Sequence, residues 1–346
     1  MVGRAAGRAA KAGDGAMAEW GLRFTGRPVV VMGRAGMDLY ADPPGTPAEG
    51  AVRFMAALGG SAGNIAAGLV RLGQAADLLS AVSDDAVGRF VTGQIAAFGI
   101  GAEHVKVVSG DARTSLAVTE TRAVGAQTVI YRNGAADFAV SPDDVMRIDM
   151  RRQGGLIVTG TALAQEPSRS AAMAAIAAAA AAGVPVILDV DYRAYSWRSA
   201  EEVRSVCLAA AHRCDMIVGN DTEFAMMAGS GDGRSLARAL GAAGRIAIYK
   251  MGAEGSETYA PEGGLRCGIF AVTAIKPMGA GDAFMAGLVA ALVEGRPLAE
   301  AVLRGSAAAA IVVCGIGCAP AMPDRTTLDA FIAGHRAPQT ARLPGP

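Results

Sequence analysis

The sequence is poor in histidine and cysteine, with three and five among 346 residues. His104, His212 and His335 stand far apart, which leaves little material for a serine–histidine–aspartate triad or a zinc hydrolase. The odd number of cysteines fits a reducing compartment better than a disulfide framework, so we expect a cytoplasmic protein. Cys314 and Cys318 are close in sequence, but no histidine or cysteine cluster accompanies them, and we expect no thiolate metal site.

The sequence also lacks net charge, long apolar runs and two nucleotide-binding motifs. Lys plus Arg and Asp plus Glu both number 32, so nucleic acid is not expected as a partner. The longest strongly apolar run, residues 171–182, is far shorter than the roughly 20 residues that span a bilayer, so no membrane partner is expected. The dipeptide Gly-Lys of a P-loop never occurs, and no Gly-x-Gly-x-x-Gly follows the first strand, which disfavours a dinucleotide-dependent dehydrogenase.

Apolar β-like runs alternate with helical segments from Arg27 onward, which predicts a doubly wound α/β fold. We expect a mainly parallel sheet with helices on both faces, in a single domain of residues 27–335. Residues 1–26 are expected to be a flexible N-terminal tail, and residues 336–346 a C-terminal tail. Strands are predicted at residues 29–32, 77–82, 156–160, 186–190, 216–219 and 245–250. Helices are predicted at residues 64–72, 87–98, 168–182, 200–212, 235–242 and 282–294.

Two segments, residues 37–58 and 113–133, break this alternation and contain few helix formers. We interpret them as strands of a small second sheet that projects from the core. Ligands of α/β sheets bind beyond the carboxyl ends of the strands, so this sheet is predicted to be a lid over a substrate. Its open strand edges also predict a homodimer.

The stretch Gly279-Ala280-Gly281-Asp282 leads a glycine-rich turn into an apolar helix. Backbone N–H groups at a helix start are unpaired and attract anions, so the turn predicts an anion hole for a phosphoryl group. The carboxylate of Asp282 is a candidate base for the attacking hydroxyl. The alternative is an ordinary aspartate N-cap after a tight turn.

A second glycine-rich helix entry contains Gly59, Gly60 and Asn64. Glycines allow a ligand to approach the backbone, and an asparagine amide offers a donor and an acceptor to vicinal hydroxyls. These three residues are therefore candidates for substrate binding. For Asn64 the alternative is a cap in the first turn of a helix.

Two further elements follow predicted strands. Asn220 and Glu223 place an amide and a carboxylate on one helical face, which suits Mg²⁺ held mainly through water. Lys250, Gly252 and Gly255 form a turn that we expect to pass under a nucleotide.

Taken together and in this order, the four elements resemble the PfkB, or ribokinase-like, family of carbohydrate kinases over roughly residues 27–325. The resemblance implies ATP and Mg²⁺ as cofactors, Asp282 as the base, and Gly279, Ala280 and Gly281 as oxyanion donors. It also implies Mg²⁺ near Asn220 and Glu223, and an adenine pocket that includes Ala308 and Val312. A catalytically silent sugar-binding protein with the same fold is the alternative, and the intact glycines and aspartate of the turn disfavour it.

One departure from the family pattern lies directly before the catalytic turn. Many members carry Asp-Thr-Thr there, as part of a monovalent-cation site, whereas this chain has Lys276-Pro277-Met278. Dependence on a monovalent cation therefore stays open.

Finer matches resemble the branch of the family that acts on sugar acids, with 5-dehydro-2-deoxygluconate of inositol breakdown as the implied substrate. A sugar acid brings a carboxylate, which guanidinium groups bind with two charge-assisted bonds. Arg34, Arg132 and Arg193 are the candidates, with isolated ion pairs as the alternative. Asp38 is expected to bind substrate hydroxyls unless it caps a turn. Because Asp191 stands where 2-keto-3-deoxygluconate kinases carry Asn, that substrate stays open, as do neutral sugars such as ribose and fructose.

Overall fold

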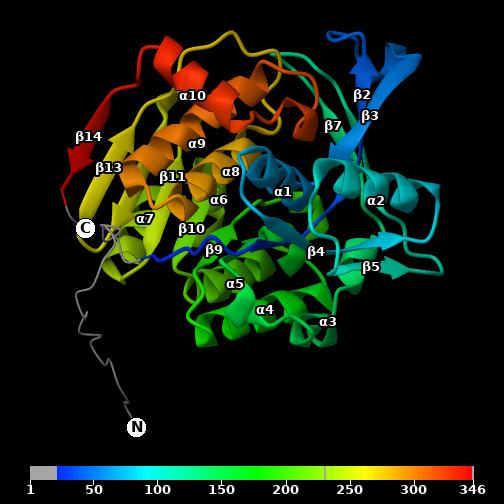
Figure 1. Cartoon of the computed structure of the whole chain (residues 1–346), viewed down its shortest axis with the longest axis horizontal. Helices are drawn as coiled ribbons and strands as arrows, with labels where there is room; N and C mark the ends of the chain where they lie inside the picture. The colour runs from blue at the N-terminus through cyan, green and yellow to red at the C-terminus, as the bar shows by residue number, and fades with distance from the viewer. Residues whose placement is uncertain (1–21, 230, 345–346) are drawn as a thin grey trace.

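The computed structural model describes residues 22–229 and 231–344. Its main sheet has the strand order β14-β13-β12-β11-β10-β9-β8-β1-β4-β5 (Figure 1). Neighbouring strands are parallel from β5 to β11 and antiparallel from β11 to β14. The strands are β1 Val29–Met32, β4 Ala76–Ser83, β5 Val105–Val108, β8 Gly155–Thr159, β9 Val186–Asp189, β10 Met216–Asn220, β11 Ile246–Lys250, β12 Ser256–Ala260, β13 Gly263–Cys267 and β14 Thr340–Leu343.

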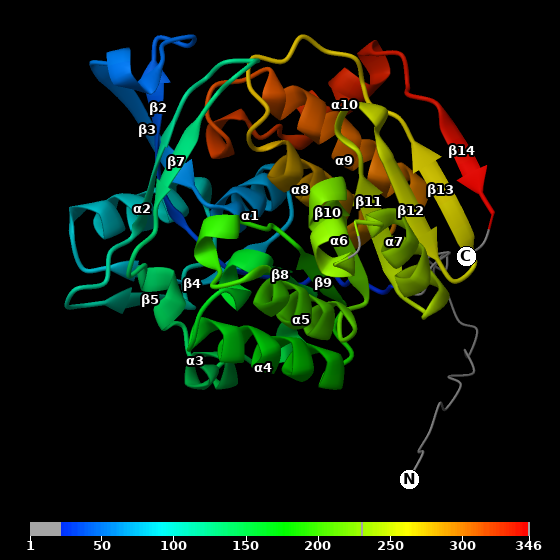
Figure 2. The same ribbon diagram turned by 180° about the vertical axis from the view of Figure 1, so that it is seen from behind.

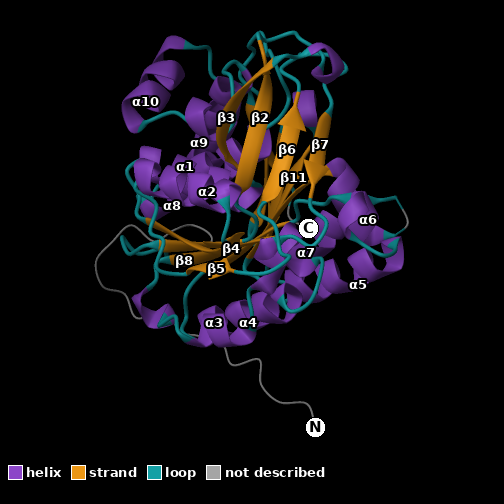
Figure 3. Ribbon diagram, turned by 90° about the vertical axis from the view of Figure 1, so that its right-hand side faces the viewer, coloured by secondary structure: helices purple, strands orange, loops and turns teal. Residues whose placement is uncertain are grey.

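Helices cover both faces of this sheet. One layer contains α1 Ser61–Arg71, α2 Ala86–Phe98, α8 Ala280–Val293, α9 Leu298–Val313 and α10 Arg325–Gly334. The other contains α3 Pro142–Met146, α4 Ser168–Ala181, α5 Ala200–Ala211, α6 Asp221–Ala228 and α7 Gly233–Ala242. Figure 3 shows α1, α2 and α8 on one side of β4, β5 and β8, and α3 and α4 on the other.

The side chains of the central strand β1 alternate between the two helix layers. Val29 and Val31 belong to one hydrophobic core, and Val30 and Met32 belong to the other. All four are buried, because successive side chains of a strand point to opposite faces and this sheet is covered on both. A run of four apolar residues is therefore the pattern that such a strand requires.

A second sheet of four strands has the order β3-β2-β6-β7. Its strands are β2 Gly36–Asp42, β3 Arg53–Gly59, β6 Ser115–Thr119 and β7 Thr128–Tyr131. In Figures 2 and 3 these strands project away from the main sheet. The predicted doubly wound sheet and the small projecting sheet are both confirmed.

The two predicted tails need correction. Within residues 336–346, β14 pairs with β13 along the sheet edge, so this segment is part of the fold. Edge pairing uses backbone hydrogen bonds and leaves most side chains of β14 exposed, which is why no apolar pattern marks it. At the other end, residues 1–21 lie outside the described residues, but Leu22 and Phe24 already pack on the core. No described helix combines the length and apolar character needed to cross a membrane.

Candidate active site

The first turn of α8 presents backbone N–H groups that no side chain caps. Gly279 is the N-cap residue, with φ at 82° in the left-handed region, where a side chain is strained. A Cβ there would also lie 2.8 Å from Cys318 Sγ. Because Gly279 occupies the N-cap position, the alternative that Asp282 is the cap is wrong. The N–H groups of this turn remain available for an anion, as predicted.

Two cavities meet at this turn. A polar cavity of about 240 Å³ is lined by Gly279 and Asp282, together with side chains from the small sheet and from α1. A larger cavity of about 640 Å³ is lined by Ala280 and Gly281 and by the ends of β11 and α9. The first turn of α8 therefore forms part of the wall of each cavity. This arrangement suits transfer of a group from a ligand on one side to a ligand on the other.

Asp282 is held in place by α1. The Asn64 side chain donates from Nδ2 to Asp282 Oδ2 over 2.7 Å. Gly60 is the N-cap of α1, so the alternative role of Asn64 as a cap is wrong. Burial, and then the nearby Asp191 carboxylate, raise the pKa of Asp282 to about 7, while Asn64 and Arg193 act in the opposite direction. A carboxylate with this pKa is well matched to general base catalysis near neutral pH.

Four buried polar atoms from residues that line the polar cavity have no hydrogen-bond partner among the described residues. They are Arg34 Nη1, Asp38 Oδ1, Ser61 Oγ and Asn64 Oδ1. An unsatisfied buried polar group costs about 1–3 kcal/mol. The cavity is therefore prepared for a ligand that carries both donors and acceptors, as a polyhydroxylated molecule does.

Tyr40, which the sequence analysis missed as a site residue, orients Asp38. Its hydroxyl donates to Asp38 Oδ2 over 3.1 Å and accepts from the backbone N–H of Cys318 over 3.0 Å. Burial raises the pKa of Tyr40 well above its usual value, so the phenol stays protonated. The two-residue period of β2 could have indicated it, because Asp38 and Tyr40 lie on one face of the strand. Other lining residues that were not predicted are Ser61, Ala117, Thr119, Thr128, Ile130, Tyr195, Met278 and Cys318.

Gly59 and Gly60 do not line the polar cavity, contrary to the prediction that they bind substrate. They make room for two residues that do line it. A Cβ on Gly59 would lie 1.9 Å from Asp38 Oδ1, and one on Gly60 would lie 2.3 Å from the backbone oxygen of Arg34. The glycines are needed for close packing behind the cavity.

The three candidate arginines have different surroundings. Arg34 and Arg193 line the polar cavity, whereas Arg132 does not. The guanidinium of Arg132 forms a buried ion pair with Asp137 and donates to the backbone oxygen of Thr161 over 3.1 Å. The prediction that Arg132 binds substrate is therefore not supported by its position. Asp137, five residues later in the chain, neutralises the charge of Arg132 in a buried ion pair.

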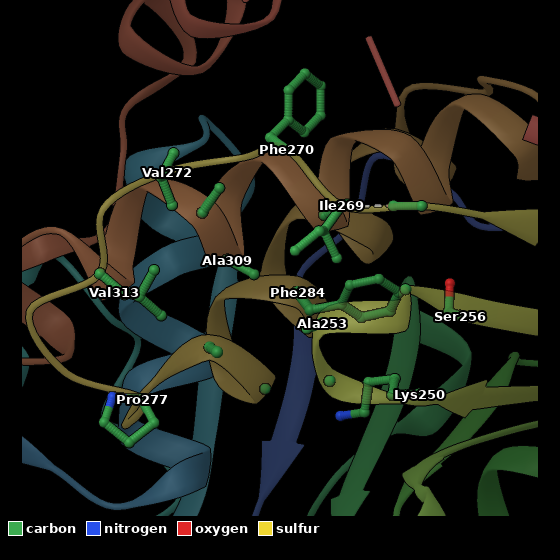
Figure 4. A pocket seen from close by; sticks show the side chains of 18 of the residues that line it. Lys250, Ala253, Ser256, Ile269, Phe270, Val272, Pro277, Phe284, Ala309 and Val313 are labelled. Carbon is green, nitrogen blue, oxygen red and sulfur yellow. Dashed lines mark hydrogen bonds between the residues drawn. The ribbon is translucent and has the colours of Figure 1, made fainter. Parts of the chain in front are cut away.

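The larger cavity has a polar side and an apolar side (Figure 4). Four residues that the sequence predicts for a nucleotide site line it: Lys250, Gly252, Gly255 and Asn220. Lys250 Nζ lies 3.5 Å from the position that a Cβ would take on Gly281. The apolar lining, which suits a flat heterocycle, includes Ile269, Phe270, Val272, Ala309 and Val313.

The predicted adenine contacts Ala308 and Val312 do not line the larger cavity. Both are buried in the hydrophobic core, while Ala309 and Val313 line the cavity. Residues four apart share a helical face, so each pair projects from its own face of α9. Because α9 is apolar on more than one face, its residue pattern leaves the rotational phase of the helix ambiguous.

A family model described as "pfkB family carbohydrate kinase" matches residues 27–325. The chain belongs to this family. It is 39% identical over 310 residues to a protein of Photobacterium profundum named 5-dehydro-2-deoxygluconokinase, covering 88% of this chain and 94% of that protein. A protein of the same name from Geobacillus kaustophilus is 35% identical over 320 residues, covering 90% and 96%. A crystal structure of a PfkB protein from Polaromonas sp. JS666 matches with a TM-score of 0.77 and 29% identity, covering 88% and 99%.

Membership of the pfkB family confirms the predicted enzyme class, a kinase that phosphorylates a carbohydrate. It also confirms the ribokinase-like fold. The dehydrogenase alternative is excluded. The motif positions in this kinase converge on one place, since Asn64 and Asp282 are joined by a hydrogen bond although they lie 218 residues apart in the chain.

Asn220 and Glu223 of this kinase form a reciprocal capping box at the start of α6. The Asn220 side chain accepts from the N–H of Glu223 over 2.9 Å, and Glu223 Oε2 accepts from the N–H of Asn220 over 2.7 Å. Glu223 Oε1 accepts from the N–H of Tyr192 over 3.0 Å. Both carboxylate oxygens are thus engaged, which fits contact with Mg²⁺ through water better than direct coordination.

Proposed function

We propose that this kinase transfers the γ-phosphoryl group of ATP to a hydroxyl of a sugar acid, with 5-dehydro-2-deoxygluconate as the substrate. The observation that carries the proposal is the polar cavity, whose lining combines Asp282 with residues that carry unpartnered polar atoms, among them Arg34 and Asp38. The Photobacterium and Geobacillus relatives, both named 5-dehydro-2-deoxygluconokinase, support the choice of acid.

In this proposal the sugar acid binds in the polar cavity and ATP binds in the larger one. Asp282 accepts the proton of the attacking hydroxyl while that oxygen bonds to the γ-phosphorus and the bond to the β-phosphate oxygen breaks. The N–H groups of Gly279, Ala280 and Gly281 stabilise negative charge on the phosphoryl oxygens. Lys250, which lines the larger cavity beside Gly281, adds a positive charge near the phosphates. Mg²⁺ would be held by the ATP phosphates and by water near Asn220 and Glu223, and it would neutralise phosphate charge.

Arg34 is the proposed partner of the substrate carboxylate. It is buried at the carboxyl end of β1, and no ion pair between described residues includes it. Arg193, by contrast, already pairs with Asp191 over 2.8 Å. The carboxyl groups of Asp38 and Asp191 lie near the Arg34 guanidinium, but its Nη1 has no hydrogen-bond partner among the described residues, so a carboxylate of the ligand would satisfy it. A neutral sugar offers no such charge.

The direct test compares phosphorylation of 5-dehydro-2-deoxygluconate, 2-keto-3-deoxygluconate, ribose and fructose by the purified chain with MgATP. We expect kcat/KM for the preferred acid to exceed that for the neutral sugars by about 100-fold, because one desolvated charge-assisted pair is worth that much. Coupled measurement of ADP formation gives each value. A preference for ribose or fructose would refute the sugar-acid assignment, and equal use of both acids would leave only the class.

We also propose a homodimer formed through the small sheet. One face of this sheet lines the polar cavity through Ala117, Thr119 and Thr128. The opposite face carries Phe54, Val129 and Tyr131, whose exposed fractions are 39%, 49% and 61%. Exposed apolar side chains gathered on the outer face of a sheet indicate that this face is covered by a partner.

Sedimentation or light scattering should give twice the chain mass for the wild type. Tyr131→Glu should shift the mass toward that of the monomer, because it places a charge on the outer face of the sheet. Met146→Glu is the control, since Met146 is exposed on α3, away from that sheet. A monomeric wild type at micromolar concentration would end this proposal.

A further inference from the structure

Lys276 is a completely buried lysine that the proposed reaction does not use. Its side chain is 0% exposed, and no ion pair between described residues includes it. Its Nζ donates to the backbone oxygen of Met278 over 2.7 Å and to that of Val312 over 3.0 Å. A buried ammonium is costly unless its surroundings compensate the charge. Here the two carbonyl groups provide that compensation, and their places in the fold indicate what the lysine does.

One of the two carbonyl groups lies at the end of α9, and the other lies at the entry of the turn Gly279–Gly281. Val312 lies in the last turn of α9, where the helix dipole concentrates partial negative charge and favours a cation. Its oxygen also accepts from the backbone N–H of Gly315 over 3.1 Å. Met278 directly precedes Gly279, the N-cap of α8. Backbone bonds from the N–H groups of Ile275 and Lys276 to the oxygen of Val313 join the same segments, at 2.9 and 3.3 Å. One ammonium thus connects the end of α9 to the entry of the anion-binding turn.

The surroundings favour the charged form of this side chain in one respect and oppose it in another. Burial lowers the pKa of Lys276 below its usual value, and the nearby Cys318 and the carboxyl groups of Asp282 and Asp38 offset only part of this effect. Carbonyl oxygens that converge on a small cation are also the ligands that bind a free alkali ion or ammonium ion. A tethered ammonium can do the same without dissociating.

We propose that Lys276 is a positioning residue whose ammonium acts as a built-in cation for the turn Gly279–Gly281, so that phosphoryl transfer needs no added monovalent cation. The proposal rests on the proposed function, because it concerns the turn that receives the phosphoryl group. It answers for this chain the question that Lys276-Pro277-Met278 leaves open in the sequence.

The test is the cation dependence of two variants. Lys276→Ala removes the ammonium and leaves space beside the two carbonyl groups, whereas Lys276→Met removes the charge but fills the space. The wild type should keep the same kcat, within twofold, when choline chloride is replaced by KCl or NH₄Cl at constant ionic strength. In choline both variants should lose about thirtyfold in kcat, which corresponds to the stabilisation that a partly buried cation gains at a helix C-terminus. KCl or NH₄Cl should restore at least fivefold in Lys276→Ala, and nothing in Lys276→Met.

Lys106→Met is the matched control, because Lys106 pairs with Asp144 on the surface and lines neither cavity. It should behave as the wild type in all three salts. Strong activation of the wild type by KCl would overturn the proposal even if neither variant folds. A loss in Lys276→Ala that no cation restores and that Lys276→Met does not share would assign Lys276 to packing alone and overturn the proposal too. An inactive wild type on every sugar would instead count against the proposed function.

Discussion

Asp282→Asn is expected to lower kcat by about three orders of magnitude, the middle of the range for removal of a general base. The amide has the shape of the carboxylate but cannot take a proton from the attacking hydroxyl. Asn64 now donates to Asp282 Oδ2 over 2.7 Å, and this bond can persist to the remaining amide oxygen. The loss should therefore appear in kcat, with little change in the binding of the sugar acid. Initial rates with saturating MgATP and a calorimetric titration of the sugar acid measure the two effects.

The pH profile gives an independent check on the same residue. The pKa of Asp282 is raised to about 7, mainly by burial, so the carboxyl group is protonated below that pH. A base must be deprotonated to act, so kcat/KM of the wild type should fall about tenfold per pH unit below 7 and level off above it. The small residual rate of Asp282→Asn should lack this step.

Asp143→Asn is the control, since Asp143 is an exposed residue of α3. It should keep the wild-type rate and profile. If Asp282→Asn turns over as fast as an active wild type, Asp282 is not the base. If the wild type itself phosphorylates no sugar, the alternative of a catalytically silent sugar-binding protein is favoured.

Most of the fold was predictable because its central parallel strands are buried on both faces. A strand such as β1 must then be a short apolar run, which is recognisable from sequence. The strands β5, β12, β13 and β14 were missed because they lie toward the two edges of the sheet. The side chains of β5 are partly exposed, and the last three strands mix glycine, polar and charged residues. Their order depends on backbone pairing rather than on an apolar pattern.

The site was predictable where a motif dictates the backbone geometry. It was less predictable where the direction of a side chain decides whether the residue lines the cavity. The turn Gly279–Asp282 is where the sequence placed it, because a left-handed residue at a helix start requires glycine. By contrast, Arg132 and Arg193 both follow strands, yet only Arg193 lines the polar cavity. Spacing along the chain does not tell which arginine side chain points into the cavity and which one points into the protein interior. Tyr40 was missed for the same reason, since its partner Cys318 is 278 residues away.

Arg34→Met is expected to lower kcat/KM for the sugar acid by about 100-fold to 1000-fold, because it leaves a desolvated carboxylate without its partner. The values for ribose and fructose should change by only a few fold, since these sugars carry no charge. The variant thus separates a specificity role from a general loss of the site. The measurement is kcat/KM for each sugar at saturating MgATP.

Two comparisons decide how this result is interpreted. Arg34→Lys keeps the charge but loses the planar fork of the guanidinium, so it should recover part of the activity on the acid. Arg53→Met is the control, because Arg53 is exposed and pairs with Asp42 on the small sheet. Equal losses on acids and neutral sugars would contradict a carboxylate contact. They would show instead that Arg34 mainly balances the carboxyl group of Asp38, whose pKa burial raises and the Arg34 charge lowers. It would support Asp191 in a smaller measure, because the pKa of Asp191 is lowered against its burial by Arg193 more than by Arg34. Thermal melting of the variant distinguishes the two, since a purely electrostatic support role would lower the melting temperature in the absence of any sugar.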